Sequence, residues 1–426
     1  MSDLYIHAQK AKEASRILAC TSADLKNTAL ENIAKALVDN RDEIIRANRE
    51  DLDKAEVSGL AMPLLKRLKF DDTKIKDVTE GIRSLIKLDD PLGKVSLHTT
   101  LDDGLELYRV SCPIGVIGVI FESRPDALVQ IASLCLKSGN SVFLKGGSEA
   151  MNTNAILAKI IYETGVESGL PEGWLHLITS RSDVTEMLGL NDYIDLIIPR
   201  GSNEFVQYIM KNTTIAVLGH ADGVCHTYIA EDADIDMALK ILIDCKTQYV
   251  AVCNTTETVL IDRKIKDKIL PLLFEAYKER NVEMFGDDEL CSEFGLSPVT
   301  EWHHEYLDYK VSLKIVDGID EAISHINRYG SGHTDAIITT DDEKASKFTL
   351  SVDSGCCFVN CSTRFSDGFR FGFGAEVGVS TSKLHARGPV GLEGLVSYKY
   401  KLMGSGQIVG DYASGKSTFK HIHHKI

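Results

Sequence analysis

The chain has 426 residues, 44% of them hydrophobic and 26% charged, which is the composition of a folded protein long enough for two or three domains. Its formal net charge of −15 argues against nucleic acid or an anionic membrane surface as a partner, because both attract basic faces. The N-terminal segment lacks the apolar stretch of a signal peptide, and no apolar run is long enough to cross a membrane, so we expect a cytoplasmic protein.

Ten cysteines are spread along the chain, most of them inside apolar runs. The closest group, Cys356, Cys357 and Cys361, has no second pair at the spacing of zinc ligands. We therefore expect these three to be core residues of one strand, and we expect no metal. Free thiols in this number fit a reducing compartment.

Two kinds of pattern fill the N-terminal quarter of the chain. Between residues 3 and 88, apolar residues recur at helical spacing, which predicts a series of amphipathic helices. Between residues 95 and 110, polar and apolar residues alternate around Asp103-Gly104, which is typical of a β-hairpin.

From residue 113 onward, strand-like and helix-like segments alternate. The expected strands are 114–121, 141–144, 174–178 and 194–198, and the expected helices are 126–138 and 154–167. Apolar strands joined by helices predict a doubly wound parallel sheet, and therefore an α/β fold. Ligands of such sheets bind at the carboxyl ends of the strands.

The series restarts at about residue 233, after a charged segment, which predicts a second α/β domain. Residues 396–407 alternate in polarity and could pair with the earlier hairpin. We expect a homo-oligomer, because an unpaired edge strand of this kind is a liability.

A turn suited to phosphate follows the strand at 141–144. Lys145-Gly146-Gly147-Ser148 offers a cation, backbone N–H groups and a hydroxyl at the start of a helix, and Glu149 comes next. Alone, the motif could be an ordinary strand-to-helix turn. Lys145 with Ser148 would accept the 2′-phosphate of NADP, whereas an acidic residue at that place would favour NAD.

A second turn, Pro199-Arg200-Gly201-Ser202, follows the strand at 194–198. Its arginine, glycine and hydroxyl fit the pyrophosphate or a ribose of the same nucleotide, although the motif is weak by itself.

Cys253 is the candidate nucleophile. It lies at a small polar break in the apolar stretch Val-Ala-Val-Cys-Asn-Thr-Thr-Glu-Thr-Val. A thiolate can attack an acyl carbon and hold the acyl group as a thioester. The alternative is a buried structural cysteine, since a free cysteine behaves as a small hydrophobe.

Together these motifs resemble the γ-glutamyl phosphate reductases, also called glutamate-5-semialdehyde dehydrogenases, of the aldehyde dehydrogenase superfamily. The similarity extends from about residue 8 to residue 412. It is densest at 113–125, 134–140, 145–150, 195–201, 220–226, 252–258, 330–336 and 362–400.

The resemblance implies an aldehyde-dehydrogenase-like fold in three parts. These are an NADP-binding domain (1–96 and 110–234), a catalytic domain with the nucleophilic cysteine (235–385), and a small β-arm for oligomerisation (97–109 and 397–412). It also implies that NADPH reduces L-glutamyl 5-phosphate to L-glutamate 5-semialdehyde and phosphate through a Cys253 thioester. This is the second step of proline biosynthesis from glutamate.

One departure from the superfamily concerns the fate of that thioester. Hydrolytic aldehyde dehydrogenases have a glutamate, which activates water, at the place that His220 takes here. Without that carboxylate the thioester should resist hydrolysis. A packed, hydrogen-bonded histidine without a catalytic part is the alternative for His220.

The resemblance implies further site residues. Ser123 stands where the superfamily usually has an oxyanion-stabilising asparagine, so the Cys253 N–H and Asn254 are expected to serve instead. Glu305 falls where the superfamily holds the nicotinamide ribose, and Glu376 is the other carboxylate candidate.

The implied substrate carries two anionic groups, which calls for fixed guanidinium groups. Arg124, Arg364 and Arg387 are the candidates, with Lys383 and His385 behind them, and a structural salt bridge is the alternative for each arginine.

Two other classes stay open from the sequence. One is an aldehyde-oxidising or CoA-acylating dehydrogenase that uses the same thiol. The other is a non-enzymatic binding protein that kept the fold. Because the chain is filled by the reductase-like region, the acyl phosphate would come from a separate glutamate 5-kinase, and a transient complex with it is conceivable.

Overall fold

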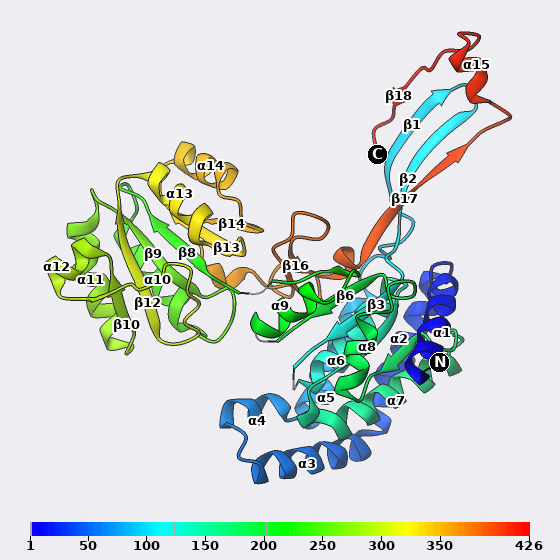
Figure 1. Ribbon diagram of the computed structural model, residues 1–426, viewed down its shortest axis with the longest axis horizontal. Coiled ribbons are helices and arrows are strands. Elements are labelled where there is room, and N and C mark those ends of the chain that lie inside the picture. Colours follow the sequence, from blue (N-terminus) through cyan, green and yellow to red (C-terminus); the bar gives the residue numbers. More distant parts are fainter. Residues whose placement is uncertain (1, 123, 202, 221) are drawn as a thin grey trace.

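The computed structural model describes residues 2–122, 124–201, 203–220 and 222–426. Two α/β lobes, each built on a parallel sheet, lie side by side, and a narrow antiparallel arm projects from one of them (Figure 1). The predicted α/β class is confirmed.

The N-terminal region is helical, as its periodicity predicts. Its helices are α1 (Asp3–Leu18), α2 (Ala23–Asp39), α3 (Arg41–Val57), α4 (Met62–Leu68) and α5 (Asp72–Ile86). Ser22 and Asp71 cap α2 and α5, because each side chain accepts a backbone N–H of the first turn. The helices pack on the first lobe.

The first sheet has the parallel strand order β5-β4-β3-β6-β7. Its elements are β3 (Val116–Ile120), α6 (Pro125–Lys137), β4 (Ser141–Lys145), η1 (Ser148–Ala150), α7 (Met151–Glu167), β5 (Leu175–Leu177), α8 (Arg181–Met187), β6 (Leu196–Pro199), α9 (Asn203–Lys211) and β7 (Ala216–Val217). The chain moves outward from β3 through β4 to β5 and then returns to the other side of β3. The carboxyl ends of β3 and β6 therefore form the switch point at which such sheets bind ligands.

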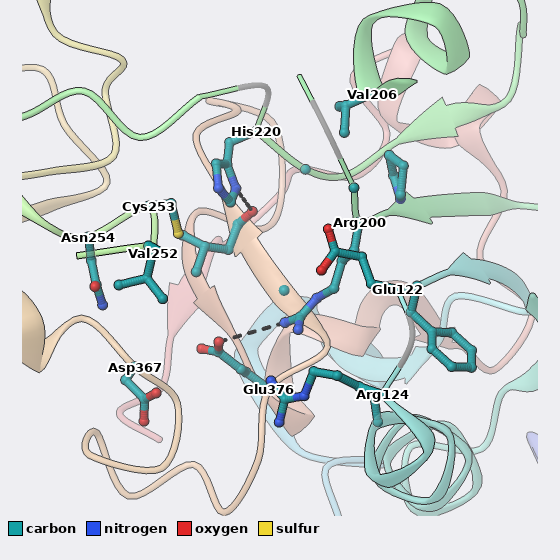
Figure 2. Close-up of a pocket in the computed structure, with 18 of the residues that line it drawn as sticks. Glu122, Arg124, Arg200, Val206, His220, Val252, Cys253, Asn254, Asp367 and Glu376 are labelled. Carbon is teal, nitrogen blue, oxygen red and sulfur yellow. Dashed lines mark hydrogen bonds and ion pairs between the residues drawn. The ribbon is translucent and has the colours of Figure 1, made fainter. Parts of the chain in front are cut away.

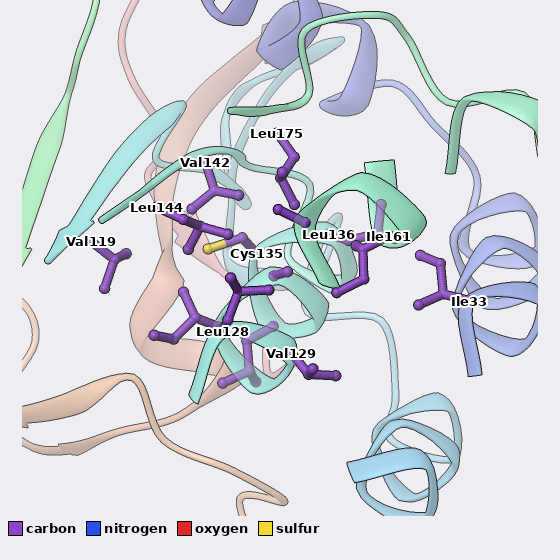
Figure 3. Close-up of a cluster of buried hydrophobic side chains, with 14 of the residues drawn as sticks. Ile33, Val119, Leu128, Val129, Cys135, Leu136, Val142, Leu144, Ile161 and Leu175 are labelled. Carbon is purple, nitrogen blue, oxygen red and sulfur yellow. The ribbon is translucent and has the colours of Figure 1, made fainter. Parts of the chain in front are cut away.

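The core of this lobe joins the sheet to the helices that cover it. Figure 3 shows side chains of α6, such as Leu128 and Leu136, between β4 and the neighbouring helices. Val142 of β4 and Ile161 of α7 belong to the same buried cluster. Each such side chain contributes roughly 1.5–3 kcal/mol, so the cluster holds the strand ends in place.

The second sheet has the order β11-β10-β12-β9-β8-β13-β14. Its strands are β8 (Cys225–Ile229), β9 (Thr256–Asp262), β10 (Glu283–Gly286), β11 (Ser297–Pro298), β12 (Lys310–Val316), β13 (Thr334–Ile338) and β14 (Cys356–Val359). Its helices are α10 (Ile235–Thr247), α11 (Lys266–Glu279), α12 (Asp288–Phe294), α13 (Ile319–Tyr329) and α14 (Asp342–Ser351).

The chain enters the second lobe earlier than the expected boundary at residue 234. Strand β8 pairs with β9 and β13, so it belongs to the second sheet. The boundary between the lobes therefore lies before Cys225. It is set by the pairing of β8 and not by the charged segment that follows this strand.

The arm has the antiparallel order β17-β2-β1-β18. Its strands are β1 (Val95–Asp102), β2 (Leu105–Pro113), β17 (Val396–Met403) and β18 (Ile422–His423), with α15 (Val409–Ala413) at its tip. Gly104 has a φ of 68° at the hairpin turn, where glycine is favoured. Both the hairpin and its pairing with the segment near 397 agree with the sequence pattern.

The segment between β14 and the arm returns to the first lobe. It contains η2 (Thr363–Phe365), the short pair β15 (Gly378–Ser380) and β16 (Gly388–Val390), and η3 (Leu392–Leu395). Within the described residues, no helix combines the length and the apolar character that a membrane span requires.

Candidate active site

A cavity of about 1080 Å³ receives residues from both lobes. Residues at the carboxyl ends of β3 and β6 line one side of it, and the segment around Cys253 lines another. The returning segment adds residues such as Arg364 and Glu376, and the N-terminal helices also contribute, for example Arg67 of α4. Figure 2 shows the side chains of Cys253, His220 and Arg200 at this cavity.

Cys253 lies in the turn between α10 and β9. The Thr255 N–H donates to the carbonyl of Val252 at 3.1 Å, and the Thr255 hydroxyl donates to the carbonyl of Tyr249 at 2.8 Å. The thiol is only partly buried, whereas Cys225 and Cys245 are buried. This placement favours a reactive thiol over a structural one.

Gly223 packs against the backbone of Cys253. A Cβ at residue 223 would lie 2.1 Å from the Cys253 carbonyl oxygen and 2.3 Å from its Cα. Only glycine allows this approach, so the segment that carries His220 fixes the position of the thiol.

A buried pair flanks the same turn. Lys246 near the end of α10 and Glu257 in β9 are fully buried, and their charged atoms are 2.6 Å apart. Burial raises the pKa of Glu257 to about 7 and lowers the pKa of Lys246. The pair ties together the two elements between which Cys253 lies.

His220 has a defined tautomer. Its Nδ1 lies 2.9 Å from the carbonyl oxygen of Val379. Because a carbonyl only accepts, the proton is on Nδ1, and the Nε2 of the neutral ring keeps its lone pair. One nitrogen of His220, one of His333 and the Cys253 sulfur all lie within 4.8 Å of one another. The packed ring is thus also a neighbour of the thiol.

Asn254 is largely used for structure. Its side-chain Nδ2 donates to the carbonyl of Ser366 at 2.8 Å, which anchors the turn to the returning segment. The buried Oδ1 has no hydrogen-bond partner among the described residues. Ser123, expected near the oxyanion, lies outside the described residues.

Four arginines among the described residues line the cavity, and one of them, Arg67, faces Glu122 at 3.7 Å. Arg364 is buried, and its Nε donates to Gln248 Oε1 at 3.0 Å. Among the described residues it has no carboxylate at ion-pair distance, and burial lowers its pKa. Arg200 faces Glu376 at 3.6 Å, and Arg124 pairs with Asp126 at 2.9 Å. Arg364 is therefore the cavity arginine best placed to take an external anion.

Two carboxylates face the same space. Burial raises the pKa of both Glu305 and Glu376. Glu376 accepts the N–H of Gly368 at 2.8 Å, and Glu305 interacts with the N–H of Gly223. Both candidates from the sequence thus lie near His220.

The first phosphate-suited turn lies beside this cavity rather than in its wall. Lys145, at the end of β4, donates from Nζ to the carbonyl of Gly146 at 2.6 Å. A Cβ at Gly146 would lie 2.2 Å from Asn154 Nδ2, so the turn requires glycine there. Gly147 precedes η1, which begins at Ser148 and includes Glu149.

The second turn does reach the cavity. Arg200 and Gly201 line it, and Ser202 lies outside the described residues.

Three residues of the 362–400 motif lie elsewhere. Lys383, His385 and Arg387 are not among the described residues that line the cavity. Arg387 donates to Asp353 at 3.1 Å, and Lys383 pairs with the same carboxylate. Arg387 thus forms a structural salt bridge, which was the alternative to substrate binding.

Comparisons with known proteins agree on one family. The chain is 63% identical to a γ-glutamyl phosphate reductase of Acetivibrio thermocellus, over 97% of this chain and 96% of the relative. It is 64% identical to one of Pelotomaculum thermopropionicum, with the same coverage. The crystal structure of γ-glutamyl phosphate reductase from Thermotoga maritima matches with a TM-score of 0.93 at 39% identity, covering 96% of this chain and all of that one. The model of the aldehyde dehydrogenase family matches residues 2–301.

The chain belongs to the γ-glutamyl phosphate reductases. The predicted family, the aldehyde-dehydrogenase-like fold and the prediction of an enzyme are thereby confirmed.

The sequence analysis missed two residues in or next to the cavity. Arg67 of α4 donates to the Tyr249 hydroxyl at 2.8 Å, which joins the N-terminal helices to the second lobe. His333, at the start of β13, is also a neighbour of the thiol. Its sequence signals are a polar Ser-Gly-His-Thr-Asp run before a buried strand and its position within the 330–336 stretch of family similarity.

Proposed function

We propose that this chain reduces L-glutamyl 5-phosphate to L-glutamate 5-semialdehyde and phosphate with NADPH, as the second step of proline biosynthesis. The observation that carries the proposal is the partly exposed Cys253 thiol, which shares one cavity with the buried Arg364. Among the described residues this guanidinium has no carboxylate at ion-pair distance. The relatives at 63% and 64% identity, which are both γ-glutamyl phosphate reductases, support the proposal.

The first step is acyl transfer to sulfur. The Cys253 thiol loses its proton, the sulfur bonds to the acyl carbon, and the bond from that carbon to the phosphate oxygen breaks. Arg364 and Arg124 would hold the anionic groups of the substrate. Because Asn254 Nδ2 already donates to Ser366, the Cys253 N–H is the better donor for the developing oxyanion.

The residues present fit a dinucleotide. A Cβ at Gly146 would overlap Asn154, so glycine keeps the backbone of the turn after β4 free of a side chain next to Lys145 and Ser148. Lys145, Gly147, Ser148 and Glu149 would hold the adenosine end, and Lys145 with Ser148 favours a 2′-phosphate. When bound, NADPH supplies the hydride.

Arg200, Gly201 and Glu305 line the cavity at the switch point, so they would orient the end of the dinucleotide nearer the thiol. After reduction, Cys253 is released as a thiolate when the aldehyde leaves.

His220 would protect the thioester. Its imidazole, held by the Val379 carbonyl, takes the place of the carboxylate that activates water in hydrolytic relatives, so that carboxylate base is lost. We propose a cytoplasmic homo-oligomer, with the arm as its interface, that receives its labile substrate from glutamate 5-kinase in a transient contact.

The decisive experiment is the reverse reaction. Glutamate 5-semialdehyde and inorganic phosphate should reduce NADP, and Cys253→Ser should lower the rate by at least about a thousandfold because the nucleophile is lost. Cys361→Ser is the matched control, because the Cys361 thiol is not part of the cavity lining. If turnover requires CoA, or if it does not depend on phosphate, an aldehyde-oxidising or CoA-acylating dehydrogenase is favoured instead.

A further inference from the structure

We propose that Cys253, His220 and His333 form an inhibitory site for Zn²⁺ or a similar thiophilic divalent cation. The binding itself depends only on the geometry, and its effect on turnover rests on the proposed function.

The three side chains form a compact donor set. The sulfur and one nitrogen from each ring lie within 4.8 Å of one another. A zinc ion needs about 2.3 Å to sulfur and about 2.0–2.1 Å to nitrogen, so closing the set takes small side-chain rotations. Three protein ligands and one open position are a common arrangement for reactive zinc sites.

His220 is oriented as metal-bound imidazoles usually are. Its Nδ1–H donates to the Val379 carbonyl, which leaves Nε2 as the coordinating atom. A backbone carbonyl in this position fixes both the tautomer and the ring plane, so little order has to be gained on binding.

His333 supplies the independent observation. The residue is 1% exposed, and its Nε2 has no hydrogen-bond partner in the part of the chain that the structure describes. Its Nδ1 lies 2.8 Å from the Thr334 hydroxyl. Such a nitrogen calls for an explanation, which a bound cation gives. The Nε2 atoms of His226 and His325 also lack a described partner, but of these three rings only His333 is grouped with the Cys253 sulfur.

The surrounding charges select the kind of cation. Arginines and carboxylates both line the cavity, so the donor atoms rather than the net charge decide which cation binds. Sulfur and imidazole donors favour Zn²⁺ or Co²⁺ over Mg²⁺. Binding exchanges the proton of the Cys253 thiol for the metal, with one proton released to solvent and no change of oxidation state.

The functional consequence follows from the sulfur lone pair. A sulfur bound to the cation cannot attack the acyl carbon, so the cation should inhibit turnover until a chelator removes it.

The test uses Co²⁺ as a spectroscopic probe on the full-length, metal-free protein. A thiolate ligand produces a sulfur-to-cobalt charge-transfer band, which the second His/Glu group of the arm (His98, Glu106 and His424) cannot produce. We expect this band at one Co²⁺ per chain, its loss in Cys253→Ser, and at least about tenfold weaker binding in His333→Gln. His424→Gln is the control and should bind like the wild type.

His333→Gln keeps a group that can bond to Thr334, and circular dichroism verifies its fold. If it misfolds, His220→Gln, whose amide can still donate to Val379, takes its place in the comparison. A missing band, a band that persists in Cys253→Ser, or unchanged affinity in the folded histidine variant would overturn the proposal. The cobalt titration uses no substrate, so its result can be distinguished from a failure of the proposed reductase activity.

Discussion

Each reactive side chain is held by a neighbour from a distant part of the sequence. Gly223 packs on the backbone of Cys253, the Val379 carbonyl accepts from His220, and Gln248 accepts from Arg364. Such contacts fix the groups before any ligand arrives, which lowers the cost of orienting them in a reaction.

Arg364→Gln should weaken substrate binding because it removes a buried cation from the cavity. We expect the KM for L-glutamyl 5-phosphate to rise roughly 10- to 100-fold, which corresponds to about 1.5–3 kcal/mol for a hydrogen bond to a charged group. Steady-state kinetics measure it.

Arg387→Gln is the matched control. It removes a partner of Asp353 outside the cavity lining, and the KM should stay within about threefold of the wild type, as for a partly exposed ion pair. Equal effects of the two changes would contradict the assignment of Arg364.

His220→Glu should introduce hydrolysis of the thioester. The new carboxylate would lie near Glu305 and Glu376, so burial and like charge should raise its pKa. Its base form, and the release of glutamate, should therefore increase as the pH rises. We expect about a hundredfold more free glutamate to form than with the wild type. Product analysis measures this gain. His220→Gln, which cannot act as the base, should show no such gain.

At the scale of the elements, the loop between β7 and β8 sets the position of the thiol. Gly223→Ala should displace the Cys253 turn, because a Cβ there would overlap the Cys253 carbonyl. We expect at least about a hundredfold loss of kcat with retained secondary structure, since misplacing a reacting group by about 1 Å has that effect.

Gly81→Ala in α5 is the control for Gly223→Ala. Nothing lies within 4 Å of a Cβ at residue 81, and alanine favours helix over glycine by about 1 kcal/mol. Thermal unfolding should show a small gain in stability with unchanged turnover. Full activity of Gly223→Ala would refute the role of the close packing.

Elements with strong periodicity could be predicted from the sequence, and those without it could not. The apolar run of β3 and the alternation of β17 gave correct strands, since each pattern reports the burial of its faces. The Gly-rich segment 362–391 has no such period. Its motif therefore suggested Arg364 and Arg387 alike, whereas the fold brings Arg364 alone of the two to the cavity. His333 was missed because its neighbours come from distant strands and loops.

At the scale of the whole molecule, the arm presents an apolar stripe on strand β17, which lies at the edge of its sheet. Tyr398, Tyr400 and Leu402 share one face of this strand, and each is more than half exposed. Exposed apolar surface next to an open strand edge is typical of an association surface.

Tyr400→Lys combined with Leu402→Lys should therefore shift the protein to smaller assemblies, because charges would be buried at the contact. Sedimentation velocity measures the change. Lys401→Glu, on the opposite face of the strand, should leave the distribution as it is. An unchanged mass for the double variant would place the interface elsewhere.

The chain crosses between the lobes twice, and both crossings pass through the cavity. Residues 218–224 lead from β7 to β8 and carry His220 and Gly223, while the returning segment carries Arg364 and Glu376. The junctions at which a protein engineer would join lobes from two different relatives thus line the cavity themselves. A chimaera made to change the cofactor preference must therefore take both crossing segments from the same relative or redesign them. Such chimaeras should be active between close relatives and inactive between distant ones.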